Sequence, residues 1–190
     1  MKTYLAMMVG NNFEEIEMVA SVDILRRAGI QIDIVSLYNQ TTLVGAHQIK
    51  VLPDLSFTEF DANKYDGILI PGGKGVESGE QPLLTSDELV QLVQEFNQRQ
   101  KLVGAICAAP QVLGRAGVLT KKKITHFPGS DQFLDDAVSD LSQAAIIDKN
   151  IITGSSAGGA IQFALTVVEY FQGSEKKAAL AQQLVVKNYY

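Results

Sequence analysis

The chain contains a single cysteine, Cys107, at a point where an apolar strand is expected to turn into a helix. Residues 104–110 read Gly-Ala-Ile-Cys-Ala-Ala-Pro, so the strand would end at Ile106 and Pro110 would occupy a first-turn helical position. A cysteine with small neighbours on such a turn matches a nucleophile elbow. We expect the helix dipole to lower the thiol pKa below its free value of about 8.5. The alternative is an inert cysteine that packs as a small hydrophobic side chain.

A glycine-rich turn, Pro71-Gly72-Gly73, follows a second apolar segment. Glycines let backbone amides approach a bound group closely, so this turn could hold an oxyanion beside a thiolate. The same glycines could instead serve only a turn that needs positive φ. A nucleotide-binding P-loop is not expected, because the Lys–Ser/Thr pair of that motif is missing.

Glu17 is the candidate partner of the thiol. On a helix that starts near Glu14, it shares an apolar stripe with Ala20, Ile24 and Ala28. Burial along that stripe would raise the pKa of Glu17 and keep it protonated, able to hydrogen bond a thiolate or transfer a proton. The alternative is a solvated first-turn glutamate favoured by the helix dipole.

The chain has two histidines. His126 ends a short expected strand and could act as a base for a nearby thiol, whereas His47 has less to recommend it. A lone histidine is more often structural. One cysteine and two histidines predict no intrachain disulfide, no cysteine-based zinc site and no multi-histidine metal centre, and we assign no metal ligand.

Short apolar segments that alternate with helical patterns must position these residues. The expected core strands cover residues 3–9, 32–37, 66–70, 102–106 and 151–153. Residues 47–52 and 124–127 read as short added strands, and residues 144–148 as the first arm of a hairpin into the last core strand. The alternation predicts an α/β domain with a mostly parallel sheet covered on both faces, and functional residues at the carboxyl ends of its strands.

Three helix starts are readable. Asn12 and Glu15 resemble a capping box for a helix over residues 14–28 that Gly29 ends, with Glu14 and Glu15 facing solvent or the helix N-terminus. Ser86 precedes a second helix with apolar residues at helical spacing, and Ser174 opens a last one.

Composition bounds the class of protein. The chain has 190 residues, 46% of them apolar and 19% charged, and a net charge of −5. These values predict one compact domain over residues 1–190 and disfavour a nucleic-acid binder. The apolar surface left over favours a homo-oligomer. No segment resembles a signal peptide or reaches the length of a membrane span, so we expect a cytoplasmic protein without a membrane partner.

The combined motifs resemble the ThiJ/PfpI family, on the branch of the parkinsonism-associated protein DJ-one and its bacterial homologues. The matching segments span nearly the whole chain and comprise residues 14–17, 22–29, 70–73, 105–110, 124–126, 152–154 and 163–165. The block around Cys107 and the Glu-Glu-x-Glu block ending at Glu17 are the specific ones.

The resemblance implies a flavodoxin-like three-layer sandwich of the class I glutamine amidotransferase-like type, a homodimer and no cofactor. It implies Cys107 as nucleophile, Glu17 as the protonated partner of its thiolate and His126 as a nearby general acid/base. Gly72, Gly73 and Ala108 would form the oxyanion and substrate-binding pocket.

Two positions depart from the family pattern. Ala108 stands where protease-like members have a histidine after the nucleophile, so peptidase activity is not expected. The segment Gly154-Ser155-Ser156 lacks the arginine of close relatives of DJ-one, which removes an expected anion contact.

Three functions then stay open. The first is a glutathione-independent glyoxalase or deglycase type of enzyme, which would turn methylglyoxal into lactate through a hemithioacetal on Cys107. The second is a redox sensor or redox-regulated chaperone that works through Cys107 oxidation. The third, a role in thiamine metabolism, has no residue-level support in this chain.

Overall fold

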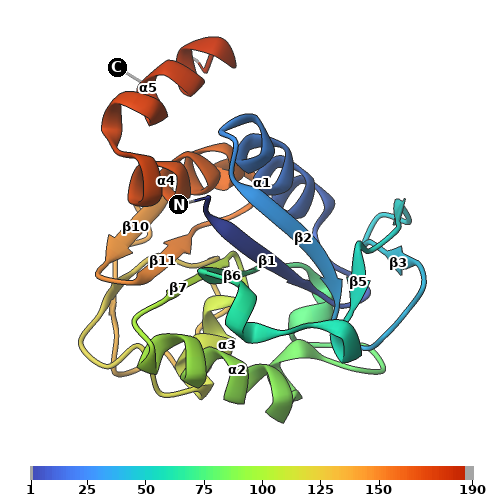
Figure 1. Cartoon of the computed structure of the whole chain (residues 1–190). Coiled ribbons are helices and arrows are strands. Elements are labelled where there is room, and N and C mark those ends of the chain that lie inside the picture. The colour runs from blue at the N-terminus through green and yellow to red at the C-terminus, as the bar shows by residue number, and fades with distance from the viewer. Residues whose placement is uncertain (1, 187–190) are drawn as a thin grey trace.

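The computed structural model describes residues 2–186, in which seven strands form a central sheet between two helical layers (Figure 1). The strand order is β10-β11-β7-β6-β1-β2-β5, and every neighbouring pair is parallel except β10 with β11. The strands are β1 (Tyr4–Val9), β2 (Gln31–Ser36), β5 (Leu55–Ser56), β6 (Gly67–Ile70), β7 (Leu102–Ile106), β10 (Ala145–Asp148) and β11 (Ile151–Gly154). The predicted sheet and the predicted hairpin are thereby confirmed.

The helices divide between the two faces of the sheet (Figure 1). One layer holds α1 (Glu15–Arg27), α4 (Ala160–Gln172) and α5 (Ser174–Gln183), and the other holds α2 (Asp87–Gln98) and α3 (Pro110–Arg115). Each layer closes its own apolar core against the sheet, because the continuous apolar strands present buried side chains to both sides. The predicted three-layer α/β fold is therefore confirmed. None of the described helices is long and apolar enough to cross a bilayer.

Short elements lie outside the main sheet. The strand β4 (Lys50–Val51) pairs with β3 (Leu43–Val44), and β8 (Lys123–Ile124) pairs with β9 (Val138–Ser139), so both added strands of the sequence analysis exist in shortened form. The connections also contain 3-10 turns at Phe57–Glu59, Ala62–Lys64, Lys74–Val76, Leu83–Thr85 and Ala157–Gly159.

The start of α1 differs from the prediction. Its N-cap is Glu14, whose side chain accepts a hydrogen bond of 2.8 Å from the Glu17 amide. Asn12 lies two residues earlier in the left-handed region, with φ of 61°, so it is out of register for a capping box with Glu15. Glu15 is buried rather than solvent-facing, because its carboxylate binds the amide and ring of His47. The predicted capping box was wrong.

Chain direction in a parallel sheet brings the ends of several strands to one edge. The segments after β1, β6, β7 and β11 all leave the sheet at its carboxyl edge. The first three of these segments contain Glu17, Gly72 with Gly73, and Cys107, and Gly154 is the last residue of β11. The fold therefore gathers residues from four distant parts of the sequence.

Candidate active site

Cys107 occupies a strained turn between β7 and α3. Its φ of 65° lies in the left-handed region that non-glycine residues rarely adopt. Two backbone hydrogen bonds of 2.9 Å hold this conformation, one from the Cys107 amide to the Gly154 carbonyl and one from the Phe127 amide to the Cys107 carbonyl. Neighbouring segments thus fix the peptide on both sides of the cysteine, and its half-buried side chain projects from the sheet edge.

Glu17 lies in the first turn of α1 and is fully buried. Its Oε2 accepts a hydrogen bond of 2.8 Å from the Gly72 amide, and its Oε1 has no partner among the described residues. Burial raises the pKa of Glu17 to about 7, even though contacts with the Cys107 thiol and the Gly72 amide act in the opposite direction. The sequence left open whether Glu17 is buried or solvated, and the structure shows that it is buried.

Gly72 is the reason that the acid and the thiol can lie together. A Cβ at this position would lie 2.6 Å from the Cys107 Cβ and 2.7 Å from Glu17 Oε2, so any side chain would separate the pair. Gly73 has φ of 107°, and a Cβ there would lie 2.4 Å from the Glu14 amide nitrogen. Both glycines are therefore required by the close approach of three segments.

The Cys107 thiol lies beside both hydrogen-bond donors and a negatively charged carboxylate, and these have opposite effects on its pKa. The backbone amides of Ala108 and Gly73 hydrogen bond the sulfur and lower its pKa, whereas burial and the Glu17 carboxylate raise it. The net effect raises the pKa of Cys107 to about 12, so the expected lowering was wrong. Helix α3 spans only Pro110–Arg115, too short for its dipole to outweigh burial and a neighbouring carboxylate.

Proton transfer within the pair resolves this conflict. When the thiol proton moves to Glu17, the carboxylate charge that opposes ionisation disappears, and the thiolate faces the two amide donors. A carboxyl group with a pKa near 7 suits this exchange at neutral pH, since it can accept and return a proton. The arrangement can therefore generate a nucleophilic thiolate when an electrophile reaches the sulfur.

His126 is buried, and both of its ring nitrogens have other partners. Nδ1 lies 3.0 Å from the Phe127 carbonyl oxygen, and Nε2 lies 3.1 Å from Ser139 Oγ. Neither Cys107 nor Glu17 is among its hydrogen-bond partners in the described part of the chain. The structure thus brings Cys107, Glu17, Gly72, Gly73 and Ala108 together and places His126 one residue from the Phe127 amide that binds the Cys107 carbonyl.

Comparisons with known proteins agree with this architecture. Residues 4–170 match the model of the DJ-1/PfpI family. The chain belongs to the DJ-1/PfpI family. The predicted ThiJ/PfpI resemblance is thereby confirmed, and the matched region contains every residue of the candidate site.

Individual DJ-1 relatives align over most of the chain. Protein DJ-1 homolog B of Arabidopsis thaliana is 34% identical over 94% of this chain, although the aligned part is 40% of that longer protein. The glutathione-independent glyoxalase DJR-1.2 of Caenorhabditis elegans is 28% identical over 96% of both chains. The crystal structure of Drosophila melanogaster DJ-1beta superposes with a TM-score of 0.90 at 29% identity, covering 98% of this chain and 99% of that one.

The raised pKa of Glu17 predicts a pH dependence of stability. In the unfolded chain this carboxyl loses its proton near its ordinary pKa of 4.5, whereas in the folded protein it does so near 7. Between these values only the folded state holds the proton, so the free energy of unfolding falls as pH rises, by about 3 kcal/mol from this group. Urea unfolding at pH 5, 6, 7 and 8 should show the fall in the wild type and a smaller one in Glu17→Gln.

Glu175→Gln, an exposed glutamate in the first turn of α5, is the matched control and should keep the wild-type pH dependence. A stability difference between wild type and Glu17→Gln that stays constant over this pH range would contradict the assignment of a raised pKa to Glu17.

Proposed function

We propose that this protein is a cofactor-independent enzyme that converts small α-oxoaldehydes such as methylglyoxal into 2-hydroxy acids. The observation that carries the proposal is the Glu17–Cys107 pair beside the Gly73 and Ala108 amides. It combines a nucleophile, a proton acceptor with a pKa near 7 and two donors for a developing oxyanion. The name of the Caenorhabditis elegans relative, a glutathione-independent glyoxalase, supports this substrate class.

The proposed reaction begins with addition to the aldehyde. The Cys107 sulfur bonds to the aldehyde carbon, and the thiol proton passes through Glu17 to the aldehyde oxygen, which gives a hemithioacetal and returns Glu17 to its carboxylate form. The amides of Gly73 and Ala108, which act on the sulfur in the free protein, would then stabilise the oxyanion as it forms.

The second half of the reaction is an internal oxidation and reduction. A proton leaves the former aldehyde carbon and one is added to the neighbouring carbonyl carbon, while the hemithioacetal hydroxyl gives up its proton and the ketone oxygen takes one up, so the first carbon is oxidised to a thioester and the second is reduced to an alcohol. Water then cleaves the thioester and releases lactate and the thiol. No external oxidant is needed, and Glu17 is the group beside Cys107 that can transfer these protons.

His126 takes a positioning role in this proposal. Its ring nitrogens bind the Phe127 carbonyl and Ser139, while the Phe127 amide binds the Cys107 carbonyl. The ring therefore stabilises the strained cysteine turn through Phe127, and Glu17 is the residue that transfers protons.

Methylglyoxal consumption and lactate formation without glutathione test the proposal. Cys107→Ser should abolish turnover, and Glu17→Gln should lower kcat by about 10² to 10⁴, because an amide cannot accept the proton. His126→Ala should cost less, at most about 10²-fold, since it changes only the position of the nucleophile. Circular dichroism must show that each variant is folded. Lactate formation by a folded Cys107→Ser variant would refute the proposal.

A second candidate function is redox sensing, which the unpartnered Glu17 Oε1 favours. A Cys107 sulfinate would add two oxygens beside the Glu17 side chain, and a protonated Glu17 could donate a hydrogen bond to one of them. Each oxidation step consumes one peroxide molecule and releases one water, first giving the sulfenic and then the sulfinic acid.

Mild hydrogen peroxide followed by peptide mass spectrometry separates the two functions. Redox sensing predicts that two oxygens are gained at Cys107 before the buried Met7, Met8 and Met18 are oxidised. The yield of sulfinate should fall in Glu17→Ala, which lacks the donor. Oxidation that proceeds to the sulfonic acid at equal rates in both proteins would exclude a sensor based on this pair.

We also propose that the protein forms a homodimer through α1. Ile16 and Val19 on this helix are about half exposed, as is Ile49 beside β4. A mostly apolar hollow adjoins them, lined by Met18, Val19, Val22, Ile34 and Val51 together with the charged residues Asp23 and Arg26. A second copy would cover this largely apolar surface.

Light scattering after size exclusion should give twice the chain mass of 20.6 kDa for the wild type. Val19→Asp should shift the mass to that of one chain, because it places a charge in the apolar interface. Val138→Asp, at an exposed valine outside this surface, should remain dimeric. A wild type that has the mass of one chain at micromolar concentration would overturn the dimer.

A further inference from the structure

Gln111 is a fully buried polar residue in the helix that follows Cys107. Its Nε2 donates to Glu77 Oε1 at 2.6 Å and to the Ala108 carbonyl oxygen at 3.0 Å, and its Oε1 accepts from the Gln132 amide at 3.0 Å. All three partners require the same orientation of the amide group, because two are acceptors and the third is a donor. One side chain therefore joins three separate segments in one geometry.

These segments are the ones that surround the thiol. Glu77 follows the 3-10 turn Lys74–Val76, which begins directly after Gly73. Ala108 follows Cys107, and Gln132 lies in the connection between β8 and β9, which also contains Phe127. The two amides that hydrogen bond the sulfur, those of Gly73 and Ala108, thus come from different segments, and Gln111 bridges the two.

We propose that Gln111 is a positioning residue that sets the spacing of the Gly73 and Ala108 amides around the Cys107 sulfur. Its bond to Glu77 is short and charge-assisted, so it resists separation of the two segments. The effect on turnover rests on the proposed function, but the effect on thiol ionisation does not.

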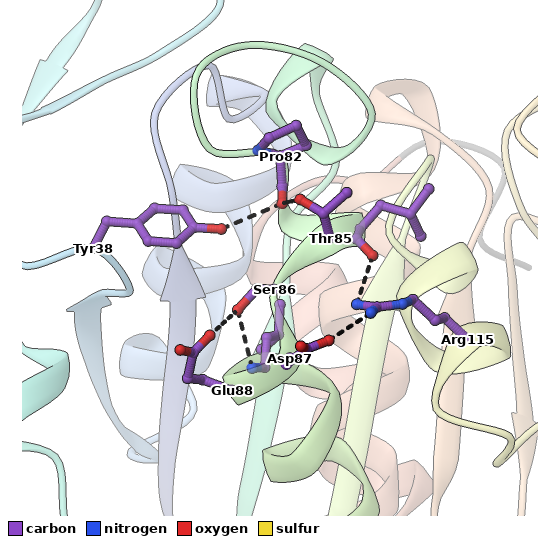
Figure 2. Close-up of polar contacts among 9 residues, drawn as sticks. Tyr38, Pro82, Thr85, Ser86, Asp87, Glu88 and Arg115 are labelled. Atoms are coloured by element: carbon purple, nitrogen blue, oxygen red, sulfur yellow. Dashed lines mark hydrogen bonds and ion pairs between the residues drawn. The ribbon is translucent and has the colours of Figure 1, made fainter.

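Arg115 makes comparable contacts at the far end of α3 and so provides a control. Its guanidinium donates to the Leu84 carbonyl oxygen at 3.0 Å and to Asp87 at 2.5 Å (Figure 2). Figure 2 also shows how Tyr38 and Thr85 reach the Pro82 carbonyl oxygen, while Ser86 caps α2. These bonds hold the end of the connection between β6 and α2 in place. Gln111 holds the part of the same connection that is nearer to Gly73.

The test is the rate of Cys107 alkylation by iodoacetamide from pH 6 to 10, without substrate. Loss of the bridge should misplace the amide donors and destabilise the thiolate. Gln111→Leu, which keeps the volume, should therefore react about tenfold more slowly at each pH, a displacement of the pH profile by about one unit. Glu77→Ala, which removes the exposed partner of the bridge, should behave in the same way even if Gln111→Leu does not fold.

Substitutions of Glu77 separate loss of the bridge from loss of a negative charge, because the two change the alkylation rate in opposite directions. Loss of a negative charge near the thiol would by itself speed alkylation, whereas loss of the bridge slows it, so a slower Glu77→Ala supports positioning. Glu77→Gln keeps an oxygen acceptor for Gln111 and should react at or above the wild-type rate. Glu80→Ala, a nearby exposed glutamate, should not react more slowly.

The proposal is overturned if Gln111→Leu and Glu77→Ala alkylate at the wild-type rate, or if Arg115→Ala slows alkylation as much as they do. When methylglyoxal turnover by Gln111→Leu and Glu77→Ala is measured in parallel, kcat should fall by a larger factor than KM rises. A wild type without turnover would refute the proposed function alone, because the alkylation profile still decides the role of Gln111.

Discussion

The buried contact between Glu17 and Cys107 is the constraint on which the rest of this structure depends. A carboxyl group and a thiol that share a desolvated site cannot both be charged without a large cost, so together they retain a proton over a wide pH range. The carboxyl end of the sheet must bring them together, and Gly72 must leave the space between them empty. A conformation that is costly for cysteine is tolerated because two backbone hydrogen bonds hold it.

This pair also determines which chemistry the candidate site could support. The groups that an acyl or aldehyde reaction needs are a nucleophile, a group that exchanges protons near neutral pH and donors for an oxyanion. Here the chain provides them from α1, the turn after β6 and the turn after β7. The layer of polar contacts behind them, from Gln111 and His126, holds the turns rather than the reacting atoms.

Much of this arrangement could be predicted from residue order. Local patterns predict the apolar strands, the helix starts at Ser86 and Ser174, and the strand-to-helix turn at Cys107. Each of these features depends on only a few residues that are neighbours in the sequence. The start of α1 could not be predicted, since the Asn12 amide binds the Val44 carbonyl and Glu15 binds His47, and each partner lies 32 residues away in the sequence. Gln111 could not be predicted for the same reason, because its partners Glu77 and Gln132 lie 34 and 21 residues from it in sequence.

By itself the sequence determined the α/β class and the family, and it singled out Cys107 and Glu17 as the candidate pair, because each rests on a periodicity or a compact motif. Only the tertiary structure decided the charge state of that site. The sequence placed a helix start behind Cys107 and so predicted a more acidic thiol, but burial and the carboxylate of Glu17 reverse the direction. Electrostatic energies depend on distance and solvent exposure, and neither is a property of residue order.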